Sequence, residues 1–390
     1  MKILTFSSLY PNAAQPTLGL FVEQRLRQLV LTERVTAEVV SPVPWFPFRG
    51  SLFGRYARFA RVPRYEVRGG IRVSHPRYPV IPAVGMNLAP YLMAWTVRRA
   101  VRERIAAGFD FDMIDAHYFY PDGVAAAMLG RWFRRPVVVT ARGTDINVIA
   151  KLPRPGRMIA RAAREAAAVI AVSRALGDEL LHLGVPADRV HVLRNGVDLD
   201  RFRPANRAAA RTDLGLAGEV LLVVGHLTGG KGHLTVLEAL VRLPHATLVI
   251  AGDGPLRRAL QARARSLGIK DRVRFCGAVP QGELPAYYNA ASMLVLVSER
   301  EGMPNVVLEA LACGTPVIAT AVGGIPEIMT DPAAGIVLAD GSVNALVDAV
   351  TRLLGRSPCA EAIRLHAEKF GWQPTTAAQL DLFTGILARS

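Results

Sequence analysis

Short apolar runs alternate with helix-length segments along most of this chain of 390 residues. In the first half the apolar runs lie at Lys2–Phe6, Ala37–Val40, Met113–Ala116, Val137–Thr140, Val169–Val172 and Val190–Leu193. The pattern restarts in the second half, at Glu219–Gly225, Ala246–Ala251, Arg272–Cys276, Met293–Val297, Pro316–Ala319 and Gly335–Val337. Short buried strands separated by helices are typical of parallel α/β sheets. We therefore expect an α/β protein with two open parallel sheets in series.

The length of the chain supports two domains, because domains usually hold about 100–200 residues. The two strand patterns meet near the segment NGVDLDRFRP (195–204). We predict an N-terminal domain over residues 1–200 and a C-terminal domain over residues 201–371.

Positive charge is concentrated in the first half. Residues 1–200 hold 28 Lys and Arg against 16 Asp and Glu, whereas residues 201–390 hold 19 against 16. Within the first half, Arg49–Arg72 contains seven arginines interleaved with aromatic residues. Such a segment suits an anionic membrane surface, so we expect membrane contact there and no nucleic acid. Nearly all of these cations are arginines, so codon bias is an alternative explanation.

Val80–Val97 is a second unusual segment, because its eighteen residues carry no charge. Pro82, Gly85, Asn87 and Pro90 break or weaken a helix, which argues against a membrane-spanning helix here. We expect either an amphipathic helix at a membrane interface or an ordinary helix that covers the sheet.

The three cysteines, Cys276, Cys313 and Cys359, show no metal-ligand spacing. The chain begins MKILTF, without a basic segment followed by a long apolar run. We expect a reducing, cytoplasmic location without a signal peptide, with peripheral contact to the inner face of the cytoplasmic membrane.

Two glutamates, Glu301 and Glu309, are separated by seven residues in SEREGMPNVVLEALACGTP (298–316). Glu301 is expected in a loop after a buried strand, and Glu309 just over one turn inside the helix Val306–Ala312. Pro304 suits the first turn of that helix, whose free N–H groups form an anion site. Carboxylates on both sides of a bound phosphate can hold hydroxyl groups, as a nucleotide sugar requires. The same spacing also occurs in ordinary strand–loop–helix units.

A second loop, LVVGHLTGGKG (222–232), carries His226 and then Lys231 between glycines. Glycines allow close backbone approach and a lysine can neutralise a diphosphate, although such a loop is often only a solvated turn. It is not a P-loop, because Gly232 follows the lysine. The loop AGDGP (251–255) lacks the third glycine of a dinucleotide fingerprint, which argues against a nicotinamide or flavin.

In the first half, His117 lies just past a strand in IDAHYFYPDG (114–123), and Arg142 and Asp145 follow another strand in ARGTDIN (141–147). Ligands of open α/β sheets bind outside the carboxyl ends of the strands. These three residues are therefore site candidates, although a lone histidine is as often structural.

Two aspartate pairs match a D-x-D metal pattern. Asp110 and Asp112 precede their strand, and Asp198 and Asp200 lie in the linker between the domains. Neither pair stands at the carboxyl end of a strand, so we expect no metal and no cofactor.

Together these motifs resemble the family 4 retaining glycosyltransferases (glycosyl transferases group 1) of the GT-B fold. The most specific part is SEREGMPNVVLEALACGTPVIAT followed by VGGIPEI, with VGHLTGGKG, RNGVDLDRF and FCGAVPQGELPAYYNAA in support. PTLGLFVEQ, AHYFYPDG and TARGTDI add weaker matches. The resemblance implies two facing Rossmann-like domains with the active site in the cleft. It also implies that Trp372–Ala388 is a helix that crosses back to the first domain.

The resemblance implies roles for individual residues. Three catalytic residues are expected: Glu301 on the donor-sugar hydroxyls, Lys231 on the diphosphate and His117 beside the reacting sugar. Glu309 matches the acid that binds the nucleotide ribose, and Gly19 lies where a flexible loop approaches the donor phosphates. The remaining donor-binding residues are His226, Gly277, Ala278 and Val279 (the nucleobase pocket), Gly302, Met303, Pro304, Asn305 and Val306.

Two positions depart from the family pattern. His226 replaces a usual arginine, so one fixed positive charge on the diphosphate is missing or depends on pH. Arg142 replaces the histidine of the HGSD or HGTD motif, which leaves the acceptor or donor contacts of Arg142 and Asp145 open.

The implied reaction moves a sugar from a nucleoside-diphosphate sugar to a glycan or lipid-linked acceptor with retention at the anomeric carbon, in cell-surface polysaccharide or glycolipid synthesis. The sequence leaves the nucleotide, the sugar, the acceptor and the oligomeric state open. An alternative is a sugar-nucleotide epimerase of the same fold. That enzyme needs a cluster of carboxylates and histidines from the N-terminal domain, where we find only His117 and Asp145.

Overall fold

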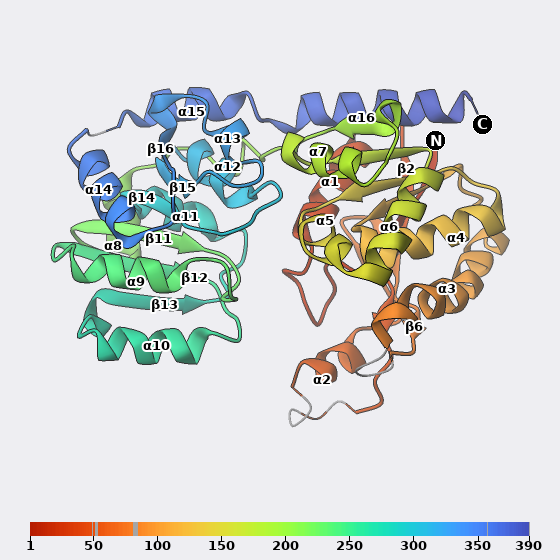
Figure 1. The fold of residues 1–390 in the computed structure, drawn as a ribbon, viewed down its shortest axis with the longest axis horizontal. Helices are drawn as coiled ribbons and strands as arrows, with labels where there is room; N and C mark the ends of the chain where they lie inside the picture. The colour runs from red at the N-terminus through yellow and green to blue at the C-terminus, as the bar shows by residue number, and fades with distance from the viewer. Residues whose placement is uncertain (49, 51–53, 81–84, 357, 390) are drawn as a thin grey trace. The chain divides into compact units, whose positions relative to one another are not determined.

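The computed structural model describes residues 1–48, 50, 54–80, 85–356 and 358–389. Its contacts divide the chain into an N-terminal unit, Met1–Asn195 with Gln373–Ser390, and a C-terminal unit, Gly196–Trp372. The boundaries predicted at residues 200 and 371 lie a few residues from these. Each unit is a twisted sheet covered by helices (Figure 1).

The sheet of the N-terminal unit has eight strands in the order β10-β9-β8-β7-β1-β2-β5-β4. Its neighbouring strands pair in parallel, apart from the antiparallel hairpin β4–β5. The strands are β1 (Lys2–Phe6), β2 (Thr36–Val40), β4 (Tyr65–Arg68), β5 (Ile71–Ser74), β7 (Met113–His117), β8 (Val137–Ala141), β9 (Ala168–Ala171) and β10 (Val190–Val192). Two short strands, β3 (Val43–Pro44) and β6 (Arg77–Tyr78), form a separate parallel pair.

The helices of this unit are α1 (Leu20–Leu31), α2 (Gly54–Arg61), α3 (Ala89–Ala106), α4 (Val124–Phe133), α5 (Thr144–Asn147), α6 (Pro153–Glu165), α7 (Arg174–His182) and most of α16 (Trp372–Leu387). Short helical turns lie at η2 (Gly85–Asn87), η3 (Phe119–Gly123), η4 (Ile149–Lys151) and η5 (Ala187–Arg189).

Within the uncharged segment at residues 80–97, the described residues 85–97 do not form one continuous helix: the turn η2 precedes α3. Helix α3 begins at Ala89 and continues past the segment through the arginines to Ala106. Pro90 lies in its first turn, where a missing N–H costs nothing, so it starts this helix and does not break it. Pro82, also expected to break a helix, is outside the described residues, as are Arg49 and Phe53. No helix in the described part of the chain combines the length and the apolar character needed to cross a membrane.

Helix α16 belongs to the core of the N-terminal unit although it comes last in the sequence. Leu380 and Phe383 are buried against Ile3 and Leu29. The buried guanidinium of Arg25 on α1 donates from Nε to Oε1 of Gln379 at 2.6 Å. A buried guanidinium needs such partners, because leaving a buried donor unsatisfied costs about 1–3 kcal/mol.

The C-terminal unit has six strands in the order β13-β12-β11-β14-β15-β16, all paired in parallel. They are β11 (Glu219–Val224), β12 (Ala246–Ala251), β13 (Val273–Gly277), β14 (Met293–Leu296), β15 (Val317–Thr320) and β16 (Gly335–Leu338). The helices are α8 (Arg207–Leu214), α9 (His233–Val241), α10 (Arg257–Ser266), α11 (Leu284–Ala290), α12 (Asn305–Ala312), α13 (Ile325–Ile328), α14 (Val343–Leu354) and α15 (Ala360–Glu368), with turns η6 (Lys270–Arg272) and η7 (Pro332–Ala334).

In each sheet the first strand lies near the middle. The following strands are first added on one side of it, and later strands are added on the other side. The chain goes from β1 to β2 on one side and later returns to β7 on the other, and β11 is flanked in the same way by β12 and β14. Such a switch point leaves a crevice at the carboxyl ends of the strands, where ligands of α/β sheets bind. The predicted pair of parallel α/β sheets is confirmed.

We predict that Phe383→Ala destabilises the protein by about 3–5 kcal/mol, because it removes a fully buried ring from the core of the N-terminal unit. Urea unfolding followed by circular dichroism measures the change. Thr384→Ala is the matched control: it lies next in the same helix but is exposed, and should change stability by less than about 0.5 kcal/mol. Equal effects of the two substitutions would contradict the packing described here.

Candidate functional site

Lys231 and Glu301 meet at the switch point of the C-terminal unit. Lys231 ends the loop after β11, and Glu301 lies in the loop after the neighbouring strand β14. Lys231 Nζ is 2.7 Å from Glu301 Oε1. Gly232 makes this approach possible: its φ is 66°, and a Cβ there would lie 2.1 Å from the carbonyl oxygen of Val297. The sequence candidates for diphosphate and sugar contact are therefore brought together.

Helix α12 starts beside this pair. It begins at Asn305, and Pro304 precedes it in an extended conformation with ψ 105°. The expectation that Pro304 forms part of the first turn is thus wrong by one residue, because its ψ is not helical. Asn305 and Val306 provide the first backbone N–H groups of the helix and are half-buried, whereas Gly302 and Met303 are buried.

Glu309 lies one turn further along α12 and is only 6% exposed. Its Oε2 accepts a hydrogen bond from the hydroxyl of Tyr288 at 2.8 Å, and its Oε1 faces Nε2 of Gln281 at 3.4 Å. Burial raises the pKa of Glu309, while these two hydrogen bonds act in the opposite direction.

The other predicted donor residues line the same edge of the sheet. His226 follows β11 with an exposed side chain. Gly277 ends β13 with φ 78°, followed by exposed Ala278 and half-buried Val279. Strand β12 lies between β11 and β13, so the predicted nucleobase pocket is two strands from the Lys231 loop.

In the N-terminal unit His117 ends β7, at the switch point, and is 1% exposed. Its Nδ1 lies 2.8 Å from Nη2 of Arg142. Because a guanidinium can only donate, Nδ1 is the acceptor and the proton lies on Nε2. Nε2 in turn is 3.2 Å from Oδ2 of Asp115. Burial lowers the pKa of His117, so the ring is neutral near pH 7.

Arg142 is held from several sides. Besides His117, its Nη1 donates to Oδ1 of Asn195 at 3.0 Å, and its guanidinium stacks 4.9 Å from the ring centre of Phe21. Burial lowers the pKa of Arg142 to about 9. The residue that departs from the family pattern thus fixes the tautomer of His117.

Asp145 holds two loops together through their backbones. Its carboxylate accepts from the N–H of Phe119 at 2.8 Å, of Gly143 at 2.8 Å and of Arg142 at 3.1 Å. Burial raises its pKa. The Asp145 carboxylate therefore links the loop after β7 to the loop after β8.

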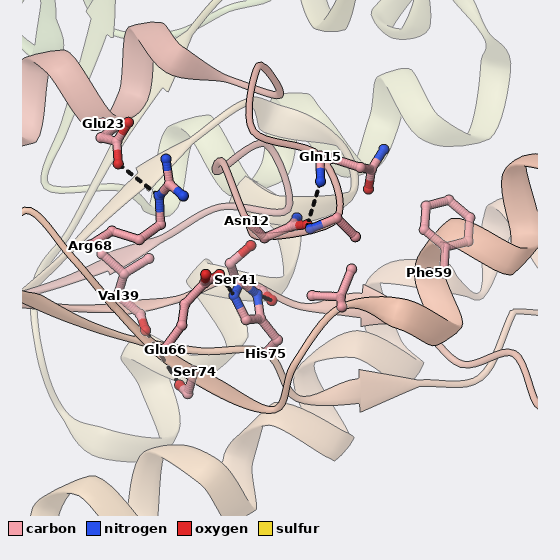
Figure 2. A network of polar contacts seen from close by, with 12 residues as sticks. Asn12, Gln15, Glu23, Val39, Ser41, Phe59, Glu66, Arg68, Ser74 and His75 are labelled. Atoms are coloured by element: carbon pink, nitrogen blue, oxygen red, sulfur yellow. Dashed lines mark hydrogen bonds and ion pairs between the residues drawn. The ribbon is translucent and has the colours of Figure 1, made fainter. Parts of the chain in front are cut away.

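Gly19 directly precedes α1, at the end of the loop that follows β1. Its φ is 63°, and a Cβ there would lie 2.2 Å from the carbonyl oxygen of Leu9. Asp122 anchors the other end of this loop by accepting from the N–H and the hydroxyl of Ser8, and burial raises the pKa of Asp122 to about 7. The loop is further closed by Asn12, whose Oδ1 accepts from the N–H of Gln15 at 3.0 Å (Figure 2).

The hairpin β4–β5 is tied to α1 and β2 by polar contacts (Figure 2). Arg68 donates from Nε to Oε1 of Glu23 at 2.9 Å. Buried His75 donates from Nδ1 to the carbonyl oxygen of Ser41 at 3.1 Å, and its Nε2 lies 2.7 Å from Oε1 of Glu66. These contacts hold the hairpin against α1 and the end of β2.

Sequence reasoning missed three residues that shape these sites. Asp115 lies two residues before His117 on one strand, a spacing that puts both side chains on one face and could have revealed it. Tyr288 and Asn195 had no such signal, because their contacts with Glu309 and Arg142 join residues far apart in sequence.

A hollow of about 850 Å³ in the N-terminal unit lies away from these loops. It is lined by residues that precede β8, β9 and β10, such as Pro136, Ala167 and Arg189, so it is at the amino ends of the strands.

In the described part of the chain, no group of three or more His, Cys, Asp or Glu could hold a metal ion. Asp110 pairs with Arg135 at 2.7 Å, and Asp112 accepts from the N–H of Lys2 at 2.7 Å.

Comparison with known proteins places both units in one family. The family model described as Glycosyltransferase Family 4 matches residues 52–201, and the model described as Glycosyl transferases group 1 matches residues 207–370. The chain is 31% identical over 361 residues to a Bacillus subtilis protein named as the teichuronic acid biosynthesis glycosyltransferase TuaC, covering 90% of this chain and 89% of that one. It is 33% identical over 369 residues to a D-inositol 3-phosphate glycosyltransferase of Xylanimonas cellulosilytica, covering 87% of each.

Solved structures share the fold at lower identity. Sucrose-phosphate synthase from Thermosynechococcus elongatus superposes with a TM-score of 0.82 at 20% identity, covering 100% of this chain and 99% of that one. HepE from Anabaena, in complex with UDP-glucose, gives 0.74 at 20% identity over 99% and 100% of the chains. The predicted GT-B architecture of two Rossmann-like domains is confirmed. The chain therefore belongs to the group 1 glycosyltransferases of family 4, and it is an enzyme of sugar transfer.

Proposed function

We propose that this enzyme transfers a sugar from a nucleoside-diphosphate sugar to a glycan or lipid-linked acceptor, with retention at the anomeric carbon, in the synthesis of a cell-surface polysaccharide or glycolipid. The contact of Lys231 with Glu301 at the switch point carries this proposal. A cation for a diphosphate and an acceptor for sugar hydroxyls are 2.7 Å apart there. The UDP-glucose complex of HepE supports a nucleotide sugar as donor.

Charge neutralisation on the leaving diphosphate is the main electrostatic task of this reaction. Lys231 supplies one positive charge, and the first N–H groups of α12, at Asn305 and Val306, supply the positive end of a helix dipole. In the structure Lys231 is paired with Glu301, so donor binding separates the pair, the lysine turning to phosphate and the carboxylate to sugar hydroxyls. We identify no carboxylate in the described residues as the nucleophile of a double displacement. This favours front-face attack by the acceptor, with the departing phosphate assisting its deprotonation.

An anionic membrane surface is the proposed partner of the N-terminal unit, which favours a lipid-linked acceptor. On α3 the exposed side chains of Tyr91 and Trp95 share one face with exposed Arg99 and Arg102. Trp95 is 70% exposed. Exposed aromatic side chains with arginines beside them are typical of helices that lie in the membrane–water interface.

The segment around α2 adds a second aromatic surface of the same character. Trp45 and Phe48 are exposed there. The ring of Phe46 lies 5.3 Å from that of Tyr56, and basic residues, Arg58 and Arg61, end α2. Tyr56, Arg58 and Arg61 belong to the arginine-rich segment Arg49–Arg72, and the three aromatic residues at 45, 46 and 48 directly precede it.

We expect Glu301→Gln to lower kcat by about 100-fold, the scale of a misplaced reacting group, with a smaller change in donor KM. Glu309→Gln should instead raise donor KM by about 10-fold with little change in kcat, because a ribose contact is the same before and at the transition state. The assay follows nucleoside diphosphate release from UDP-, GDP-, ADP- and dTDP-sugars, with product analysis for epimers.

Glu299→Gln is the control for these variants, because Glu299 is exposed two residues before Glu301. Equal effects of the Glu301 and Glu309 variants on kcat and KM would remove the assigned roles. Formation of an epimer without transfer would replace the proposed function by the epimerase alternative.

Removal of divalent metal should leave turnover unchanged, because Lys231 and the start of α12 provide positive charge for the diphosphate without a cation. The measurement compares initial rates after dialysis against EDTA with rates in added magnesium or manganese. A loss of turnover that either metal restores would contradict metal-independent catalysis.

The protein should float with phosphatidylcholine vesicles that contain phosphatidylglycerol but not with vesicles of pure phosphatidylcholine. Each arginine near an anionic surface contributes about 1 kcal/mol to binding. Added salt screens this attraction and should weaken binding. Trp95→Ala should reduce the bound fraction several-fold. Leu365→Ala, also strongly exposed but in the C-terminal unit, should not. Equal binding to both vesicle types would refute an electrostatic membrane contact.

A further inference from the structure

Glu309 is a buried carboxylate whose two oxygens have different surroundings. Oε2 accepts a 2.8 Å hydrogen bond from the hydroxyl of Tyr288, which is itself fully buried. Oε1 has a longer contact, 3.4 Å, with Nε2 of half-buried Gln281. One oxygen is therefore held firmly from the protein interior, and the other is held loosely from the side of the loop after β13.

Tyr288 is fixed so that it can hold this oxygen. Its ring packs edge to face against Phe202, with ring centres 6.0 Å apart. Its backbone carbonyl accepts from the hydroxyl of Thr315 at 2.7 Å. Burial, and then the charge of Glu309, raise the pKa of Tyr288 well above its ordinary value, so its hydroxyl stays a proton donor at any pH at which the enzyme works.

We propose that Tyr288 is a positioning residue of the donor site: its hydroxyl fixes Oε2 of Glu309, so that the carboxylate stays ionised and presents Oε1 to the ribose hydroxyls of a nucleoside diphosphate. This proposal rests on the proposed function, which gives Glu309 its ribose contact. Gln281 is the exchangeable partner, whose weak contact the ribose replaces.

The physical reason lies in the cost of burying a charge. Burial favours the neutral form of a carboxyl group, and hydrogen bonds to the carboxylate favour the ionised form. An ionised carboxylate accepts from hydroxyls at both lone pairs of its free oxygen, whereas a protonated one has lost part of that capacity. Without the Tyr288 hydroxyl, the ionised form of Glu309 would lose its strongest partner.

Other charged or titratable groups around Glu309 do not take over this task. Arg201, in the segment after β10, bonds Oε1 of Gln281 at 3.0 Å and attracts Glu309 only from a distance. Cys313 follows α12, and burial raises its pKa to about 12, so it stays neutral. Arg364 of α15 donates to the carbonyl oxygen of Ala312 at 2.9 Å.

The test compares Tyr288→Phe with Tyr287→Phe, the neighbouring tyrosine on the same helix, in calorimetric titrations with UDP, GDP, ADP and dTDP. Tyr288→Phe should weaken binding of the nucleotide that the wild type binds by about 10-fold, and Tyr287→Phe should not. The loss should grow as pH falls. The pKa of Glu309 is higher without its hydrogen bond, so binding is lost at a higher pH than in the wild type. Gln281→Met removes only the weaker contact, at a half-buried position. It should therefore shift the pH dependence of nucleotide binding less than Tyr288→Phe does.

A double-mutant cycle separates positioning from general destabilisation. If Tyr288 acts through Glu309, adding Tyr288→Phe to Glu309→Gln should weaken binding no further. Independent, additive losses, or a pH profile of Tyr288→Phe parallel to that of the wild type, would overturn the role of Tyr288 alone. Failure of the wild type to bind any nucleoside diphosphate would overturn the proposed function together with it.

Discussion

The contact between the loops after β11 and β14 depends on a close backbone approach that a side chain at position 232 would prevent. A Cβ there would lie 2.1 Å from the carbonyl oxygen of Val297. The same geometry recurs on the other side of Glu301, where a Cβ on Gly323 would lie 2.2 Å from the carbonyl oxygen of Glu301. Because glycines lie on both sides, the Glu301 loop is packed against two neighbouring loops through backbone. The positions of Lys231 and Glu301 follow from that packing.

The N-terminal unit organises its switch point by buried charge. Arg142 bonds His117 and Asn195, and Asp145 bonds three backbone N–H groups of the loops after β7 and β8. Buried charges persist only when they are paired or hydrogen-bonded. Each of these contacts therefore restricts the backbone that carries His117, and the ring is held in one tautomer.

The sequence was sufficient to predict twelve of the strands, because each of these is a short apolar run. It did not predict β3 and β6, which are two residues long, or the hairpin β4–β5, whose strands contain charged residues. It also indicated Lys231, Glu301 and Glu309, since they follow strands of one sheet. It could not reveal the start of α3, because a proline breaks a helix interior but suits a first turn, and the two cases look alike in sequence. The partners of Glu309 were equally hidden. Tyr288 lies 21 residues away, and only the packing of α11 against α12 makes it a neighbour.

The two carboxylates of the proposed donor site, Glu301 and Glu309, differ in what it costs to move them. The pair Lys231–Glu301 is partly exposed, with 32% and 11% of the side chains accessible. Because the lysine reaches solvent, water screens this pair more than it would a fully buried one, so a donor can separate it at lower cost. Glu309 is buried, and removing its hydrogen bond from Tyr288 would leave a buried acceptor unsatisfied at a cost of about 1–3 kcal/mol. A carboxylate that must follow a sugar through bond breaking needs the first kind of environment. A carboxylate that only anchors a ribose gains from the second, because its contact does not change along the reaction.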